Sequence, residues 1–400
     1  MEPTAGQILA HRLRAHHLDR PLAAHEGERA AGACGLQNTP PGAWETALFN
    51  RLAGCTLAGL RQALYEDKVL VAAWSFRGAP VVFPTRESRV FLEPLAALPG
   101  EEPWIYTQGI GLALDFLGLT FEQLLPWVKE AARILGTRTV QGKDALDQAL
   151  AGAVEPHLPP DKLPLWRAPT MYGAPDRQTV GGAAVSFLLR PCSFAGLVVF
   201  GERAGASPTF TAFESWIGHP PVPMEQPGRA LVRKFLHCYG PTNVQALASW
   251  LGASPAQAQR LWREAQGDMA AVNVGKRTLY ALSQDLDSLF SPPPQQERLL
   301  LLGPHDPYLD LREPWDRALL LEDQGQQRQL WRMVGNPGAV TVGGRIVGIW
   351  RSKARPKATD IEVILFQPLA PQQRQALEEQ AQAYGRFRQS ALGRLQIQGP

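Results

Sequence analysis

The sequence predicts an α+β fold in which groups of three helices each lead into a β-hairpin. Three observations predict it: residues 227–291 read as three short helices and two strands, the first 86 residues show the same order, and residues 292–400 are rich in strand patterns. Three helices followed by a hairpin form a winged helix. We therefore predict tandem winged-helix units with a small β-rich C-terminal domain.

The unit over residues 227–291 has the clearest signals. Its first helix, "RALVRKFLHCYG", is amphipathic and ends at Gly240. The second, "PTNVQALASWLG", begins with Thr242 as its cap and stops at Gly252, and the third begins with Ser254 as its cap. Two short helices joined by a glycine-containing turn are typical of a helix-turn-helix. "MAAVNVGKRTLYAL" then predicts a hairpin wing that turns near Gly275.

The predicted first unit, residues 1–86, follows the same order. A helix is expected over roughly 6–18, and a second from Pro40 to Leu52, with Thr39 as its N-cap and proline in its first turn. A third opens at Thr56, and "VLVAAWSF" and "APVVFP" read as strands on either side of a turn.

Residues 87–226 are mainly helical and are predicted to contain a second winged-helix-like unit. Pro126 should kink or split the helix in which it lies, and the proline-rich "EPHLPPDKLPLWRAP" reads as a linker. After a second linker, "SPPPQQE", the strand patterns and a terminal helix of residues 292–400 predict the C-terminal domain.

Composition sets the broad class. The 400 residues are 45% hydrophobic, and the net charge of +3 permits an anionic partner without requiring one. The four cysteines are widely separated, with no C-x-x-C pair, so the spacing suggests neither a zinc site nor a disulfide framework. No apolar run approaches the roughly 20 residues of a membrane span, and no signal-peptide pattern is present. We expect a cytoplasmic monomer without metal or cofactor.

Two basic segments are candidates for binding phosphate. The hairpin "GGRIVGIWRSKARPK" carries five cations and one tryptophan that suits stacking: Arg345, Trp350, Arg351, Lys353, Arg355 and Lys357. The alternative is a solvated basic loop with the tryptophan in the core. The helix "HRLRAHHLDR" presents Arg12 and Arg14; its histidines lack the i, i+3 or i, i+4 spacing of helical metal ligands, so we expect a phosphate-facing surface instead.

The run "HDPYLDLREPWDR" offers three carboxylates, Asp306, Asp310 and Asp316. Paired carboxylates can perform acid–base chemistry. The alternative is structural, with aspartate opening a turn before proline and Asp316 pairing with Arg317.

Several segments together resemble the AlkZ/YcaQ family of bacterial winged-helix DNA glycosylases. They are "GLQNTPPGAWETALFNR", "LVAAWSFRGAPVVF", "RALVRKFLHCYGPTNVQALASWLG" and "LLGPHDPYLD…DR" followed by "VTVGGRIVGIW", in this order from about residue 6 to residue 387. The resemblance implies tandem winged helices around a concave, basic channel for double-stranded DNA. It also implies a hairpin that probes the duplex, and we place Arg77 of the second segment among the expected DNA contacts.

In that family a Gly-Leu pair precedes a Gln-apolar-Gln or Gln-apolar-Asp triplet that holds the hydrolytic water. Here Gly35-Leu36 precede Gln37, Asn38 and Thr39, so the first glutamine matches and the third acceptor is threonine. The resemblance implies that Gln37 positions water, assisted by Asn38 or Thr39, for hydrolysis of the N-glycosidic bond of alkylated or bulky cationic purines. The alternative is a DNA-binding protein of the same fold, regulatory or architectural, without this activity.

Overall fold

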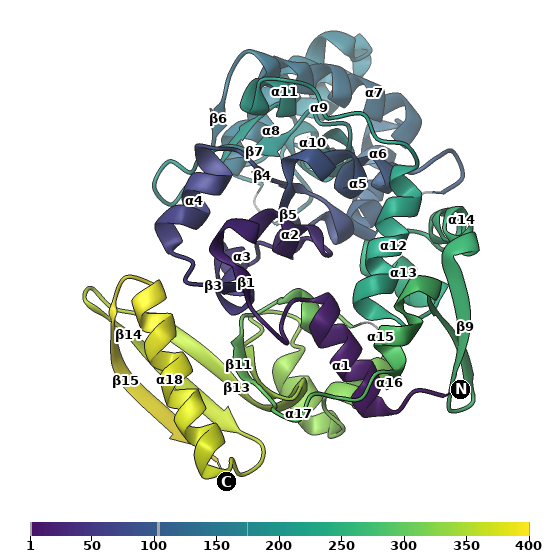
Figure 1. Ribbon diagram of the computed structural model, residues 1–400. Helices are drawn as coiled ribbons and strands as arrows, with labels where there is room; N and C mark the ends of the chain where they lie inside the picture. Colours follow the sequence, from purple (N-terminus) through teal and green to yellow (C-terminus); the bar gives the residue numbers. More distant parts are fainter. Residues whose placement is uncertain (1, 102–104, 174, 312, 400) are drawn as a thin grey trace.

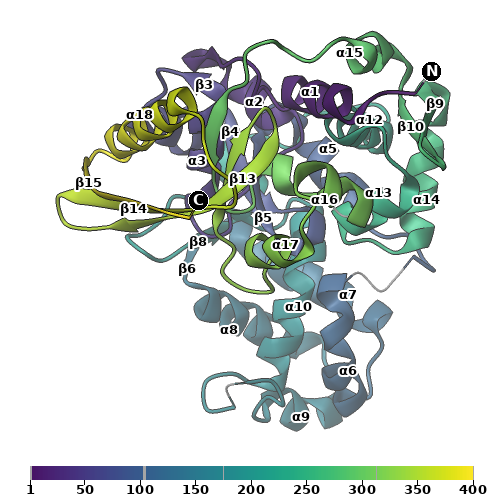
Figure 2. The same ribbon diagram turned by 90° about the horizontal axis from the view of Figure 1, so that it is seen from below.

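The computed structural model describes residues 2–101, 105–173, 175–311 and 313–399 (Figure 1). No helix within these ranges is long and apolar enough to cross a membrane. The first two parts of the chain have helices with a short strand between them and then a hairpin, and the third has three helices and a hairpin, so each follows the order of a winged helix. A five-stranded sheet with a long helix follows (Figures 1 and 2).

The first winged-helix unit begins after a leading helix, α1 (Ala5–Ala15). Its helices are α2 (Gly27–Gly32), α3 (Ala43–Arg51) and α4 (Leu57–Tyr65), and its strands are β2 (Leu36–Gln37), β4 (Leu70–Trp74) and β5 (Pro80–Pro84). Short strands β1 (Leu22–Ala23) and β3 (Leu52–Ala53) pair with each other, and α5 (Ser88–Leu92) closes the unit. As predicted, Thr56 caps α4 by accepting from the backbone N–H of Gly59.

The second unit repeats the order. Its elements are α6 (Gly111–Leu117), α7 (Phe121–Ala132), β6 (Val140–Gln141), α8 (Lys143–Val154), α9 (Leu163–Arg167), α10 (Val180–Phe194), β7 (Val199–Phe200), β8 (Thr209–Thr211) and α11 (Phe213–Ile217). The expected split at Pro126 does not occur, because α7 continues through it. The expected linker is also folded: it forms α9, whose Trp166 is buried and donates to the carbonyl of Ala151.

The first two units share one six-stranded sheet, in the order β2-β5-β4-β7-β8-β6. The order is mirrored about the β4–β7 pair, which meets at Ala72 and Phe200. The mirror places Gln37 and Gln141 at equivalent ends, opposite Val81 and Thr209 respectively. The next backbone N–H after each glutamine donates to a proline carbonyl, Pro80 in one unit and Pro208 in the other. Gln141 is therefore the structural counterpart of Gln37.

The third unit consists of α12 (Pro227–Tyr239), α13 (Val244–Leu251), α14 (Pro255–Glu264), the hairpin β9 (Met269–Val274) and β10 (Arg277–Leu282), and α15 (Leu286–Phe290). Ser254 caps α14 and Gly252 ends α13 in the left-handed region, as predicted. The predicted N-cap of α13, Thr242, lies one residue before the observed N-cap, Asn243. Asn243 accepts from the N–H of Ala246, because Thr242 is extended and pairs with Tyr280.

The C-terminal part is a five-stranded sheet, in the order β11-β12-β13-β14-β15, with α18 against it. Its elements are β11 (Leu299–Leu302), α16 (Pro314–Leu320), α17 (Gln324–Leu330), β12 (Gly338–Val342), β13 (Arg345–Ala354), β14 (Ala358–Leu365), α18 (Pro371–Phe387) and β15 (Ala391–Gln398). The end of the β13–β14 hairpin projects away from the rest of the molecule (Figure 2). One hydrophobic core contains Leu9, Phe83, Phe235 and Leu300, so the first unit, the third unit and this sheet pack on one another.

Candidate functional site

Gln37 lies at the end of β2, where the chain leaves the mirrored sheet. Gly35, two residues before it, has a φ of 74°, and a Cβ there would lie 2.8 Å from a methyl group of Val81. Only glycine fits that conformation and that space. The tight approach to β5 brings the half-buried Gln37 side chain to the lining of a cavity.

Arg77 holds this side chain in place. It lies in the turn between β4 and β5, with a left-handed φ of 55°. Its Nη2 donates to Oε1 of Gln37 over 2.9 Å and lies 2.6 Å from Oδ2 of Asp310. Its Nη1 donates to the carbonyl of Trp250 in α13 over 2.6 Å. Acceptors in three separate parts of the chain therefore fix the planar guanidinium.

The cavity has a volume of about 340 Å³. Polar and charged groups share its lining with apolar side chains: Gln37, Arg77, Ala79, His305, Leu309, Asp310, Leu311, Arg317, Leu330, Trp331, Arg332, Asn336 and Pro337. A site of this size accepts a small planar ligand such as a nucleobase. The lining combines the side-chain carbonyl of Gln37 and the carboxylate of Asp310 with the cations Arg77, Arg317 and Arg332.

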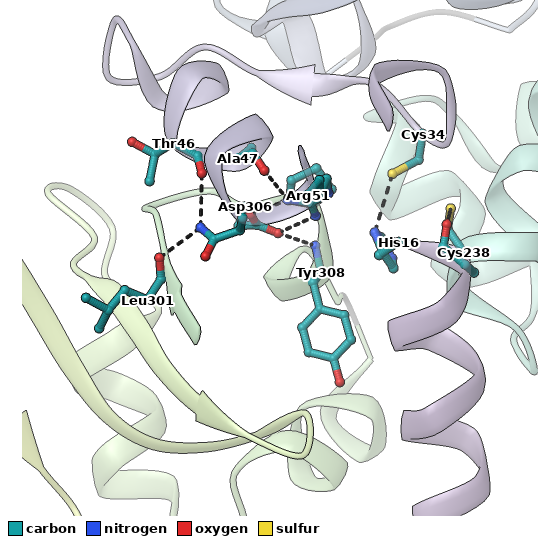
Figure 3. Close-up of polar contacts among 12 residues, drawn as sticks. His16, Cys34, Thr46, Ala47, Arg51, Cys238, Leu301, Asp306 and Tyr308 are labelled. Carbon is teal, nitrogen blue, oxygen red and sulfur yellow. Dashed lines mark hydrogen bonds and ion pairs between the residues drawn. The ribbon is translucent and has the colours of Figure 1, made fainter. Parts of the chain in front are cut away.

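The three carboxylates of the acidic run have different positions. Asp306 is fully buried, where both its oxygens accept from the guanidinium of Arg51 over 2.8 Å (Figure 3). Asp316 is also buried, and its partner is Arg12, at 2.8 Å, rather than the predicted Arg317. Only Asp310 of the three lines the cavity. Sequence reasoning noticed this residue among paired carboxylates but did not connect it with Gln37.

Thr39 does not cap α3. That helix begins at Ala43, and its N-cap is Gly42 in the left-handed region, because the two prolines and the glycine form a turn first. Asn38 stabilises the turn: its Oδ1 accepts from the N–H of Gly42 over 2.7 Å. Thr39 itself is exposed, and neither it nor Asn38 is among the described residues that line the cavity. Of the predicted triplet, Gln37 alone contributes to this lining.

The predicted phosphate contact by Arg12 is wrong. Its side chain is 1% exposed and donates to the carbonyls of Tyr239, Gly240 and Pro241 as well as to Asp316. Most of α1 is buried between the third unit and the C-terminal part, so a basic helix proves to be a core helix. Arg14 is half-buried and donates to the hydroxyl and carbonyl oxygens of Ser288.

Trp350 is in the core, as the alternative interpretation of the basic hairpin expected. It is 3% exposed, and its indole N–H donates to the carbonyl of Leu302 over 2.8 Å. Side chains alternate along a strand, so Arg351 and Lys353 lie on the opposite face from Trp350 and are exposed.

The cations of the hairpin divide into two groups. Arg351, Lys353, Arg355 and Lys357 lie around its projecting end, whereas Arg345 begins β13 at the other end and faces Glu322 at 3.8 Å. Arg351 lines a second cavity of about 330 Å³ that shares Asn336 and Pro337 with the first. Arg351 therefore lies near residues that also line the cavity of Gln37, and the role of the hairpin in binding DNA stays a prediction.

Comparisons with known proteins show similarity over most of the chain. Residues 30–387 match the family model described as DNA glycosylase AlkZ-like. Among solved structures, the chain is similar to the Streptomyces sahachiroi DNA glycosylase AlkZ, with a TM-score of 0.76, 19% identity, and complete coverage of both chains. No curated protein matches its sequence. Because the family model spans most of the sequence, from α2 to the end of α18, this chain belongs to the AlkZ-like DNA glycosylase family.

Proposed function

We propose that this DNA glycosylase hydrolyses the N-glycosidic bond of alkylated or bulky cationic purines in double-stranded DNA. The observation that carries the proposal is the arrangement of Gln37 and Asp310 on one guanidinium, with both side chains lining one cavity. A cationic purine is already a good leaving group, so its release does not require protonation of the base.

In the proposed reaction the bond between the sugar C1′ and the purine nitrogen breaks, and its electron pair neutralises the positive charge on the base. Water adds to C1′, its proton passes to solvent or to Asp310, and the products are the free base and an abasic site. The Gln37 carbonyl has two lone pairs, and Arg77 occupies one. The second accepts a hydrogen bond from the attacking water.

Asp310 supplies a negative charge, which the neutral side chains of Gln37, Asn38 and Thr39 lack. Its carboxylate stabilises the oxocarbenium character that develops at C1′ and accepts a hydrogen bond from the attacking water. We assign these tasks to Asp310 rather than to Asn38 or Thr39, since Asn38 is engaged by Gly42 and Thr39 is exposed. Arg77 is a positioning residue that acts through the two groups it holds. The exposed cations of the hairpin, Arg351 to Lys357, are placed to hold the phosphate backbone.

The test uses duplex DNA that carries a single 7-methylguanine, or a mustard adduct, and measures abasic sites by alkaline cleavage in single turnover. Wild type should release the base, and Gln37→Ala should reduce the rate by about 10²–10³-fold while DNA affinity stays within a few-fold.

The matched control is Gln141→Ala, at the equivalent position in the second unit, which should leave the rate unchanged. If wild type releases no base from any cationic adduct, the substrate proposal fails. A DNA-binding role without base release is then favoured.

A further inference from the structure

Three side chains that favour soft metal ions meet in the core, outside the cavity. His16 follows α1, Cys34 lies between α2 and β2, and Cys238 is in α12 (Figure 3). Their ligand atoms all lie within 4.8 Å of one another, and Cys34 Sγ is 3.8 Å from Nδ1 of His16. The three are 1%, 2% and 0% exposed. The cluster was not predicted from the sequence, because its members come from three separate segments.

The separations match those around a tetrahedral zinc ion. Zinc binds thiolate at about 2.3 Å and imidazole nitrogen at about 2.0–2.1 Å, which places the two ligand atoms about 3.6 Å apart. The observed 3.8 Å between Cys34 Sγ and His16 Nδ1 therefore needs only a small contraction. The hydroxyl oxygen of Tyr239 lies 3.9 Å from Cys34 Sγ and donates to the carbonyl of Pro307.

The charges around the cluster also suit a divalent ion. Two thiolates and a neutral imidazole around Zn²⁺ sum to zero, so the occupied site carries no net charge into the core. The neighbouring Arg51 is balanced by Asp306. Cys238 Sγ donates to the carbonyl of Ala33 over 3.5 Å, so the metal must displace that proton.

We propose that His16, Cys34 and Cys238 bind one zinc ion, which ties α1 and α12 to the segment that leads into Gln37. Binding forms two zinc–sulfur bonds and one zinc–nitrogen bond, and the protons of the two thiols pass to solvent. The site is structural, and it does not depend on the proposed substrate. It departs from the expectation from spacing that the protein holds no metal.

The test is native mass spectrometry of the full chain. The protein is reduced, freed of metal with a chelator, and given one equivalent of zinc. We expect one zinc per chain and a rise in Tm on addition. Cobalt in place of zinc should produce the absorption of a thiolate–cobalt bond. Cys34→Ser and Cys238→Ser should lose both signals.

Cys192→Ser and Cys55→Ser are the matched controls and should keep both. Cys192 is as deeply buried as Cys238 but is outside the cluster. If the serine variants fail to fold, the cobalt spectrum of the wild type and its number of zinc ions per chain still test the proposal. Reduced wild type that takes up neither metal overturns the proposal, and so does a Cys34–Cys238 disulfide in the protein isolated under thiol-protecting conditions.

Discussion

Arg77 Nη2 and Asp310 Oδ2 are 2.6 Å apart at the wall of the cavity, with each side chain 15% exposed. The pair joins the hairpin turn of the first winged helix to the segment that follows β11. It also fixes the direction of the Gln37 amide, because the same nitrogen of Arg77 donates to Oε1. A side chain fixed in this way loses little conformational entropy when it binds a ligand.

Asp310→Asn keeps the size of the side chain and removes its charge. We expect base release from a 7-methylguanine duplex to fall about 10²-fold, because the carboxylate no longer balances charge at C1′. DNA affinity should stay within a few-fold. The measurement is the single-turnover rate beside Tm, with the exposed Asp176→Asn as control. A fall in Tm with an unchanged rate would show that Asp310 is structural only.

Charge reversal of Arg351, Lys353 and Arg355 to Glu should weaken duplex binding. Each phosphate contact contributes about one unit to the slope of log affinity against log salt, so the slope should also decrease. The control reverses three exposed arginines elsewhere, Arg20, Arg133 and Arg177, which produces the same change in net charge. Equal slopes for the two triple variants would remove the hairpin from the interface.

Removal of one partner of the buried ion pair between Arg51 and Asp306 should greatly lower the free energy of unfolding. Arg51→Met leaves an uncompensated carboxylate among buried groups, so we expect a loss of about 3–5 kcal/mol in the free energy of unfolding. Arg167→Met breaks the ion pair with Glu155, in which the arginine side chain is 61% exposed. It should lower the free energy of unfolding by less than about 1 kcal/mol. Denaturant titration compares them, and similar losses for both variants would contradict the argument.

Stability should fall on mild acidification, in part through His11. Burial lowers the pKa of His11 to about 4, from 6.5, and nearby His237, Arg12 and Arg14 act in the same direction against Asp285. The unfolded state therefore binds more protons between pH 6.5 and 4, and stability is lost as pH falls through that window. Between pH 7 and 5 the loss from this residue is about 2 kcal/mol.

His11→Gln keeps a polar group near Ser288, which lies 3.0 Å from Nδ1 of the histidine. This variant should lose less stability than wild type between pH 7 and 5, as measured by denaturant titration at each pH. The control His219→Gln changes an exposed histidine and should retain the wild-type dependence. Parallel curves for wild type and His11→Gln would contradict the assignment.

The winged-helix units were predictable because their signals are local. Ser254 and Gly252 mark the ends of neighbouring helices by backbone chemistry that needs no tertiary partner. The same rules failed at Thr39, where Gly42 adopts a left-handed conformation and supplies the cap instead. A threonine before proline is compatible both with an N-cap at Thr39 and with a turn before the helix. The hydrogen bond from the N–H of Gly42 to Oδ1 of Asn38 distinguishes the two, because it belongs to the turn.

Gln37, Arg77 and Asp310, which line the cavity, were singled out from the sequence, but the contacts among them were not predicted. Gln37 was predicted from the order of the motifs around it. Asp310 is far from Gln37 in the sequence, and both side chains contact the guanidinium of Arg77. Arg12 was misjudged because a charged residue on an amphipathic helix is normally solvated. Here the carbonyls at the end of α12 and the carboxylate of Asp316 satisfy its guanidinium inside the core. Such pairings depend on packing between units, which local pattern does not encode.

The mirrored sheet also limits association between molecules. An unpaired strand edge can recruit a strand from another chain, and isolated winged helices would leave β4 and β7 open. Here those two strands pair with each other, and the outer strands β2 and β6 are only two residues long. The outer strand β15 of the other sheet has eight residues and is partly exposed. Of the outer strands of these two sheets β15 is the longest, so strand pairing between molecules through them is expected there, and a purification tag at the N-terminus leaves that edge undisturbed.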